Sequence, residues 1–367
     1  MRVCLISDWY LPRQGGMELH IHHLALELQR AGHEVEIVCA TPLRGGSESD
    51  EITVHRLSDS LLPILQSIWK LRTVRTVEHL LRMGRYDVVH CHTAFSPLSL
   101  VAAALARKLG IPCLLTEHSV LGTDGRWVLS AVEFLCGWSC WPDVLSAVSN
   151  FVANELRRVC GRPIELLPNG VRPEEWKQSS QDGSPIVVSV MRLRPRKRPL
   201  DVVRAIPLVH QHLQSRPHFI LVGDGPERAK VERVVDQLGV RDYLELPGWQ
   251  PRQQVKEILS RASIFVLPTR NEALSIATME ALASGLPAVA MNHGGVGDVL
   301  THGQDGFLAH DFDDWVGHIV RLCRDHALRR RMAAVTHETA ARFAWPRVLD
   351  RHLELYDLAR WRCRQRQ

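Results

Sequence analysis

Short apolar runs alternate with helical patterns along most of the chain. The first apolar run is Val3–Ser7, and a turn separates it from a segment with helical periodicity. In that segment the apolar positions are Ile21, Leu24, Ala25 and Leu28. Gly32 suits the left-handed residue that ends such a helix. Further strands are predicted at Glu34–Cys39, Asp87–Cys91 and Cys113–Thr116. This alternation predicts a parallel sheet with helices on both faces.

The same alternation starts again after a polar stretch near the middle of the chain. Lys177–Pro185 is rich in turn residues and is interpreted as part of an interdomain connection. Strands are then predicted at Ile186–Val190, Phe219–Val222, Ile264–Leu267 and Ala288–Ala290. The pattern therefore predicts an α/β protein of two Rossmann-like, doubly wound domains facing each other across a cleft. We place these domains at residues 1–169 and 170–345, and a last helix at 346–367.

Composition adds few constraints to this picture. The 367 residues are 45% hydrophobic and 23% charged, as in ordinary globular proteins. Nine scattered cysteines lack metal-ligand spacing and are expected to be reduced thiols, which suggests a cytoplasmic location. The N-terminal apolar run is too short for a signal peptide. The longest uninterrupted apolar run, Leu100–Ala106, is far below the ~20 residues that cross a bilayer. The excess positive charge lies in the second half, and no nucleic acid partner is expected.

Three turns between a strand and a helix contain glycines. Gly15-Gly16 follows the first strand, and similar turns contain Gly223-Asp224-Gly225 and Gly294-Gly295. Glycine lets the backbone approach a ligand closely, and a helix N-terminus attracts anions. A plain tight turn explains one such pair equally well.

Cations crowd the segment that follows the strand Ile186–Val190. Residues 192–198 contain five basic side chains, among them Arg192 and Lys197. Ligands of open α/β sheets bind at this edge, where arginine can grip phosphate oxygens and lysine adds a point charge. A solvated surface run is the alternative.

The strongest signal lies between Pro268 and Pro287. Ser275 suits a helix N-cap and Gly285 a helix end, which places Glu272 in a loop and Glu280 inside an apolar helix. A carboxylate buried there needs a partner, since an unpaired buried charge costs several kcal/mol. Sugar and ribose hydroxyls would serve, and an ion pair to a neighbouring helix is the alternative.

Together these motifs resemble glycosyltransferase family 4, the retaining enzymes of the GT-B fold. The resemblance rests on Gly15-Gly16-Met17-Glu18, Arg192 with Lys197, and the two glutamates separated by seven residues. It extends to Pro168-Asn169-Gly170-Val171, Gly223-Asp224-Gly225-Pro226, and the tail around Trp345, Leu355 and Tyr356. It implies an N-terminal acceptor-binding domain, a C-terminal nucleotide-sugar-binding domain, and a last helix that packs back on the N-terminal domain.

The resemblance also implies roles for individual residues. Arg192 and Lys197 would hold the donor pyrophosphate, and Glu280 would bind the ribose. Glu272 and His118 would lie beside the transferred sugar, and Gly16 would let the N-terminal loop approach the donor. The implied donor-binding set is Gly15, Gly16, Gly223, Glu272, Ala273, Leu274, Ser275, Ile276 and Glu280.

The expected mechanism is front-face substitution with retention of configuration. Two cations stabilise the leaving diphosphate, so no metal or other cofactor is expected, and the sequence has no Asp-x-Asp pair. His20, His22 and His23 would point in different directions on a helix, which argues against a metal site. Arg198 and Ser275 stand where glycine is common in the family, and Asp298 where glutamate is frequent.

Donor and acceptor are the least determined features. The segments 15–21, 90–96 and 118–122 look most like the phosphatidylinositol N-acetylglucosaminyltransferase branch of the family, which suggests UDP-N-acetylglucosamine. The acceptor would be a lipid-linked or small polyol hydroxyl. Leu61–Arg85 mixes apolar and basic residues and could contact an anionic membrane at its inner face, although an ordinary domain helix explains it better. Alternatives are GDP-mannose or UDP-glucose as donor, a sugar-nucleotide epimerase, and a non-catalytic binding protein.

Overall fold

The computed structural model describes residues 1–13, 15–42, 51–57, 71–179 and 184–366. The chain forms two compact units. Unit 1 comprises Met1–Gly170 and Trp345–Gln367, and unit 2 comprises Val171–Ala344. Parts of the predicted segments Lys177–Pro185 and Leu61–Arg85 lie outside the described residues.

The described strands of unit 1 form a seven-stranded parallel sheet in the order β3-β2-β1-β4-β5-β6-β7. The strands are β1 (Arg2–Ser7), β2 (Glu34–Cys39), β3 (Thr53–Arg56), β4 (Val88–His92), β5 (Cys113–Glu117), β6 (Val144–Ala147) and β7 (Glu165–Leu166). Every residue of β4, β5 and β6 is buried, because helices cover both faces of the sheet.

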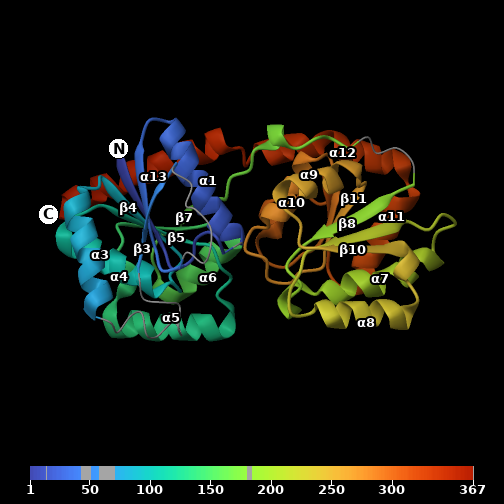
Figure 1. Cartoon of the computed structure of the whole chain (residues 1–367), viewed down its shortest axis with the longest axis horizontal. Helices are drawn as coiled ribbons and strands as arrows, with labels where there is room; N and C mark the ends of the chain where they lie inside the picture. Colours follow the sequence, from blue (N-terminus) through green and yellow to red (C-terminus); the bar gives the residue numbers. More distant parts are fainter. Residues whose placement is uncertain (14, 43–50, 58–70, 180–183, 367) are drawn as a thin grey trace. The chain divides into compact units, whose positions relative to one another are not determined.

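The helices of unit 1 are α1 (Gly16–Arg30), α3 (Leu71–Gly84), α4 (Pro97–Leu109), α5 (Gly122–Cys136), α6 (Asn150–Cys160) and α13 (Trp345–Arg366). Ser96 and Ser149 cap α4 and α6 by accepting a backbone N–H, and left-handed Gly110 and Gly161 end these helices. The last helix, α13, packs against α1 and β5 (Figure 1). Its Leu355 and Tyr356 lie in the core of unit 1.

Unit 2 repeats this architecture with a six-stranded parallel sheet among its described residues, in the order β10-β9-β8-β11-β12-β13. The strands are β8 (Ile186–Val190), β9 (His218–Val222), β10 (Leu244–Gly248), β11 (Ile264–Leu267), β12 (Ala288–Met291) and β13 (Gly306–Ala309). Its helices are α7 (Pro199–Gln211), α8 (Arg228–Leu238), α9 (Arg252–Arg261), α10 (Ile276–Ala283), α11 (Phe312–Arg324) and α12 (His326–Ala341). Val171, where unit 2 begins, pairs with Ala344, where it ends.

The predicted fold class is confirmed. Both sheets are parallel, and each strand predicted from an apolar run agrees with an observed strand to within one residue at either end.

Ser275 is the N-cap of α10, as predicted. The helix ends at Ala283, and left-handed Gly285 follows two residues later. None of the described cysteines forms a disulfide.

Candidate active site

Strand order places the candidate residues of unit 2 at one edge of its sheet. β8 lies between β9 and β11, so the connections that follow β8 and β11 leave the sheet on opposite sides. Such a switch point, at the carboxyl ends of the strands, is where open α/β sheets bind ligands. Lys197 follows β8 and Glu272 follows β11. These two predicted residues therefore lie on neighbouring strand ends.

The side chains of Lys197 and Glu272 form an ion pair. Lys197 ends a short 3-10 turn, Pro195–Lys197, and its ammonium group donates a hydrogen bond to Glu272 Oε2. The side chains are only 20% and 11% exposed, respectively. A second bridge joins the same segments, because Arg196 Nη1 lies 2.9 Å from the carbonyl oxygen of Asn271. The two segments are thus fixed to each other by both charge and backbone contacts.

Arg192 lies on the stretch that extends β8 toward this pair. The backbone N–H groups of its neighbours, Met191 and Leu193, donate to the carbonyls of Val222 and Asp224. These bonds hold the residue between β8 and the loop that follows β9. Arg192, Lys197 and Gly223 therefore belong to one continuous edge of unit 2.

Gly223 occupies a position that excludes a side chain. Its φ is 134°, and a Cβ there would collide with the carbonyl oxygen of Met191. Its N–H donates to the carbonyl of Gly248 at 2.8 Å. The glycine therefore lets the backbones after β8, β9 and β10 approach one another closely.

The loop Glu272–Ile276 is anchored to the turn that follows β12. Glu272 pairs with Gly294 in a parallel bridge, and the N–H of Gly295 donates to the Glu272 carbonyl at 2.6 Å. Ala273 and Leu274 lead from there to Ser275, which has a φ of 71° and whose Oγ accepts from the N–H of Thr278 at 3.3 Å. The first residue of α10 is Ile276. The five predicted donor-binding positions of this loop thus lead directly into a helix N-terminus, which favours an anion.

Two residues that stand in place of the family's usual glycines have left-handed backbones. Arg198 has a φ of 55° and Ser275 a φ of 71°. Glycine adopts this conformation without steric cost, whereas other residues need compensating contacts. Arg198 has such a contact, since its guanidinium lies 2.7 Å from Asp201 Oδ2. The cap hydrogen bond serves the same purpose at Ser275. Both residues thus have the backbone conformation that glycine favours.

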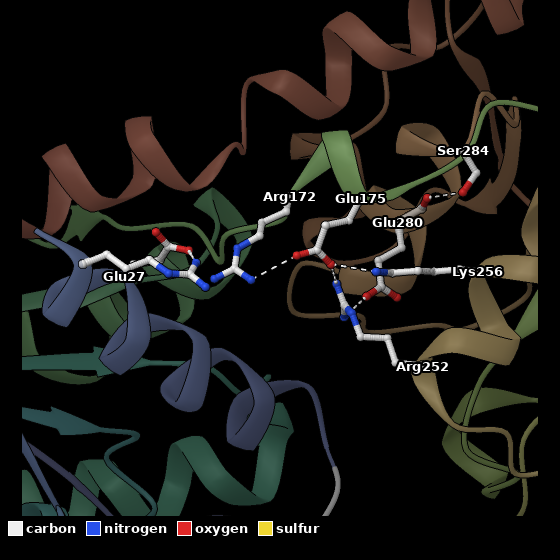
Figure 2. A network of polar contacts seen from close by, with 8 residues as sticks. Glu27, Arg172, Glu175, Arg252, Lys256, Glu280 and Ser284 are labelled. Carbon is white, nitrogen blue, oxygen red and sulfur yellow. Dashed lines mark hydrogen bonds and ion pairs between the residues drawn. The ribbon is translucent and has the colours of Figure 1, made fainter. Parts of the chain in front are cut away.

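Glu280 is bound by an arginine of the neighbouring helix (Figure 2). Arg252 of α9 donates from Nη1 to Glu280 Oε1 at 2.7 Å. Of the two partners that the sequence allows for this carboxylate, the structure shows the ion pair. Burial raises the pKa of Glu280, and the Arg252 guanidinium opposes that shift. The side chain keeps 13% exposure.

A wider network holds Arg252 in place. Its guanidinium lies 5.0 Å from the centre of the Trp176 ring. It also approaches Glu175, which accepts from Lys256 at 2.8 Å and from Arg172 at 3.0 Å (Figure 2). Burial raises the pKa of Glu175, but the hydrogen bonds from Lys256 and Arg172 outweigh this effect and lower it to about 2. Through Arg252, Glu280 thus belongs to a network of charged side chains that also includes Glu175, Lys256 and Arg172.

In unit 1, the glycine pair lies where α1 begins. Gly15 is extended, with φ −169° and ψ 167°, and Gly16 is the first residue of the helix. Glu18 is buried in the first turn and pairs with Arg13 at 3.2 Å. The strand–turn–helix arrangement predicted for Gly15 and Gly16 is therefore present at the carboxyl end of β1.

His118 follows β5 and belongs to a cluster of imidazole rings. Its Nε2 lies 3.0 Å from His92 Nδ1, at the end of the adjacent strand β4. The His20 ring on α1 is 5.3 Å away between centroids. His90 packs on His92 at 4.1 Å, and His352 of α13 lies 5.7 Å from His90. We call His20, His90, His92, His118 and His352 the histidine cluster.

The histidine cluster is held neutral by its surroundings. Burial, reinforced by the neighbouring imidazoles, lowers the pKa of His20, His90 and His92 well below the ordinary value. Burial lowers the pKa of His118 to about 3 and that of His352 to about 4. Trp345 stacks on His20, and Tyr356 and Thr116 hydrogen-bond His90 at 3.0 and 2.7 Å. At neutral pH these rings are therefore uncharged.

The structure thus gathers the predicted residues in two groups. Arg192, Lys197, Gly223, residues 272–276 and Glu280 belong to unit 2, whereas Gly15, Gly16 and His118 belong to unit 1. The sequence did not predict the network of Arg252, Lys256 and Glu175 or the other members of the histidine cluster. The pair His90-x-His92 at the end of a buried strand was the available signal for the cluster. In the described part of the chain, no group of three or more His, Cys, Asp or Glu side chains is arranged to hold a metal ion.

Known structures share this two-unit architecture. Sucrose-phosphate synthase from Thermosynechococcus elongatus matches 97% of this chain and 98% of its own, with a TM-score of 0.78 at 20% identity. Anabaena HepE in complex with UDP matches 97% of this chain and all of its own, with a TM-score of 0.80 at 17% identity. The chain therefore has the GT-B fold of two parallel-sheet α/β domains.

Sequence comparisons identify the family. The protein-family model described as "Glycosyltransferase Family 4" matches residues 14–175. The family model described as "Glycosyl transferases group 1" matches residues 171–338. The chain belongs to glycosyltransferase family 4. Within the described ranges, no helix is both long and apolar enough to cross a membrane.

Its relatives include named and uncharacterised members. One subunit of the human phosphatidylinositol N-acetylglucosaminyltransferase is 28% identical over 81% of this chain, which spans only 63% of that protein's length. The corresponding protein of Arabidopsis thaliana is 29% identical, over 86% of this chain and 73% of its own. An uncharacterised glycosyltransferase of Methanocaldococcus jannaschii is 24% identical over 98% of both chains.

Proposed function

We propose that this glycosyltransferase uses a sugar-nucleotide donor, with UDP-N-acetylglucosamine as the first candidate, and transfers the sugar with retention to a lipid-linked or small polyol hydroxyl. The observation that carries the proposal is the Lys197–Glu272 pair at the switch point of unit 2, beside Arg192 and Gly223. The names of the human and Arabidopsis relatives support N-acetylglucosamine, and the UDP complex of Anabaena HepE supports a uridine nucleotide.

The ion pair acts as a preformed donor site. On donor binding, Lys197 exchanges the Glu272 carboxylate for an oxygen of the diphosphate, and Glu272 then accepts hydrogen bonds from hydroxyls of the sugar. Arg192 adds a second cation, and the N-terminus of α10 adds backbone N–H groups. Because Arg252 already binds one oxygen of Glu280, the other oxygen accepts from the ribose hydroxyls.

The reaction needs charge stabilisation more than a nucleophile from the protein. The bond between the anomeric carbon and the diphosphate oxygen breaks, and a bond to the acceptor oxygen forms on the same face of the sugar. The departing phosphate oxygen takes the acceptor's proton. Lys197 and Arg192 stabilise the negative charge that develops on the leaving group, so the mechanism requires no metal. Neutral His118, in unit 1, is assigned as a hydrogen-bond partner of the acceptor hydroxyl.

The direct test is a thermal-shift screen of UDP-, GDP- and ADP-sugars. A donor at 100 times its dissociation constant adds about 2.7 kcal/mol to the free energy of unfolding. We expect UDP-N-acetylglucosamine to give the largest shift. A larger shift with GDP-mannose or UDP-glucose would redirect the donor assignment, and no shift with any sugar nucleotide would refute the donor site.

Hydrolysis of the donor in the absence of acceptor separates the remaining alternatives. A transferase releases free sugar and nucleotide slowly, and Lys197→Ala is expected to reduce this rate by about 10²- to 10³-fold, the usual cost of losing one charge-stabilising group. Bound donor without turnover indicates a binding protein. Conversion of the donor into a second sugar nucleotide, detected by chromatography, indicates an epimerase.

A further inference from the structure

Helix α5 presents an apolar face to solvent. Trp127, Phe134 and Leu135 are 74%, 91% and 80% exposed. Val128 and Ala131 are exposed as well, and the spacing of these five residues places them on one side of a helix. We call Trp127, Val128, Ala131, Phe134 and Leu135 the α5 face. Large apolar side chains that cluster in this way mark an interaction surface, whereas scattered ones do not.

The opposite side of α5 makes the contacts that hold the helix in unit 1. Leu129 is buried, and the Glu133 carboxylate accepts from the N–H and the hydroxyl of Ser139 at 2.9 and 2.7 Å. Arg126 pairs with Glu155 of α6 at 3.7 Å. In Figure 1 the helix lies along the outer edge of unit 1, next to α6. The α5 face is therefore not needed to attach this helix to its own domain.

Four arginines surround the segment that follows the C-terminal end of α5. Arg162 donates to the carbonyl of Ser139, and Arg107 of α4 donates to the carbonyl of Cys140 at 2.6 Å. From α13, Arg362 donates to the Asp143 carbonyl at 3.1 Å, and Arg366 pairs with the Asp143 side chain at 3.4 Å. We call Arg107, Arg162, Arg362 and Arg366 the basic cluster.

The α5 face and the segment that the basic cluster contacts are close together in the sequence. Phe134 and Leu135 are followed within eight residues by the segment Ser139–Asp143 that the arginines contact. Outside the α5 face, the acidic residue Asp124 lies in the first turn of the helix, at the end remote from the basic cluster. The surface thus combines exposed aromatic and aliphatic groups with neighbouring cations.

We propose that the α5 face inserts into the headgroup region of an anionic lipid bilayer, with the basic cluster bound to lipid phosphates. Helices that lie in a membrane interface combine an apolar side rich in Trp, Phe and Leu with flanking basic residues. Attraction to anionic lipid adds to the burial of apolar surface and weakens with salt.

The proposal extends the proposed function by naming the surface that brings the enzyme to a lipid-linked acceptor. It does not depend on the donor, since docking requires no sugar nucleotide. Vesicle binding and donor hydrolysis are therefore measured separately, and the failure of one does not imply the failure of the other.

The test is flotation of the full chain with vesicles of phosphatidylcholine, with and without phosphatidylglycerol. We expect binding to the anionic vesicles that falls with salt, and at least a tenfold loss of affinity in F134E/L135E. R107Q is expected to weaken binding to anionic vesicles severalfold. The control is L238E, which places a single glutamate on the exposed last residue of α8 in unit 2 and should bind as the wild type does.

A spectroscopic measurement covers the case in which the double variant misfolds. Brominated lipid should quench tryptophan fluorescence more in the wild type than in W127F, because Trp127 would lie at the boundary between headgroups and acyl chains. Equal quenching in the two proteins, binding of F134E/L135E as tight as that of the wild type, or no binding of the wild type to anionic vesicles would each overturn the proposal. So would a lipid-free dimer that light scattering detects in the wild type but not in F134E/L135E.

Discussion

Lys197 and Glu272 are 75 residues apart in the sequence, and their contact depends on the neighbouring positions of β8 and β11. Lysine and glutamate are residue types that usually lie on the surface of a protein. Together they form a mostly buried ion pair in which each group loses hydration that the other must replace. A diphosphate and a sugar can take over both roles, so the pair is suited to exchange partners on binding.

Glu280 provides a prediction for nucleotide affinity. Glu280→Ala should weaken UDP binding by about tenfold or more, since a hydrogen bond to a charged group contributes about 1.5–3 kcal/mol. Isothermal titration calorimetry with UDP measures the effect. The matched control is Glu245→Ala, which removes the carboxylate of another ion pair of unit 2, with Arg261 at 2.8 Å, on an exposed surface. Equal affinity in wild type and Glu280→Ala would contradict the ribose assignment.

Gly223 provides a prediction for stability. Gly223→Ala should lower the free energy of unfolding by about 2 kcal/mol or more, because the new Cβ meets a backbone carbonyl and the φ of 134° suits only glycine. Urea denaturation measures the change. Gly317→Ala in α11 is the control, since its Cβ would meet no atom within 4 Å. This control should be neutral or stabilising by up to about 1 kcal/mol.

At the scale of elements, the histidine cluster joins α1, β4, β5 and α13. Its rings come from positions 20 to 352, so no local pattern in the sequence could place them together. The strand ends, by contrast, were predictable, because parallel strands finish at a common edge. Glu280 shows the limit of such reasoning: the helical pattern placed the carboxylate in an apolar setting, but only tertiary packing selects Arg252 as its partner.

The histidine cluster predicts acid sensitivity. The folded-state pKa values lie below the ordinary value of about 6.5, so the unfolded chain binds more protons between that pH and the folded-state pKa. Stability is therefore fully present above pH ~6.5 and falls as the pH drops toward 4, the folded value of His352. Each such histidine contributes a slope of about 1.4 kcal/mol per pH unit.

Urea unfolding at a series of pH values measures that slope. His352→Gln should reduce the slope by about 1.4 kcal/mol per pH unit, the contribution of one proton. His79→Gln, on the exposed surface of α3, should leave the slope unchanged. A free energy of unfolding that stays constant between pH 7 and pH 5 would show that the buried rings do not control acid stability.

Short and half-exposed strands account for most of the missed elements. β7 has two residues, and β10 reads Leu-Glu-Leu-Pro-Gly with only its ends buried. Such segments lack a continuous apolar run and are stabilised mainly by a neighbouring strand. The longer buried strands and the glycines at helix ends needed no tertiary information, and they determined the fold class.

At the scale of the whole molecule, the last helix is part of the first unit. Trp345, Leu355 and Tyr356 of α13 are buried in the core of unit 1, and a Cβ on Gly170 would lie 2.5 Å from the Trp345 ring. Truncation after Ala344 should therefore abolish the cooperative unfolding of unit 1 and leave unit 2 folded.

Calorimetry of the truncated chain tests this expectation. One transition should remain, and UDP should still raise its midpoint, because the proposed nucleotide site lies in unit 2. Loss of both transitions, or a remaining transition that UDP does not shift, would contradict the assignment of the site to that unit. Truncation after Arg364 is the control, since it removes only residues 365–367.

Unit 2 begins at Val171 and ends at Ala344, and these two residues pair in a parallel bridge in which the Val171 N–H donates to the carbonyl of Phe343 at 2.9 Å. Domains generally fold in order as the ribosome releases them, the N-terminal one first. Here the later domain has all of its residues before the earlier one does, since unit 1 must wait for residues 345–367. A nascent chain therefore carries an incomplete first domain, with exposed core, until residues 345–367 have left the ribosome.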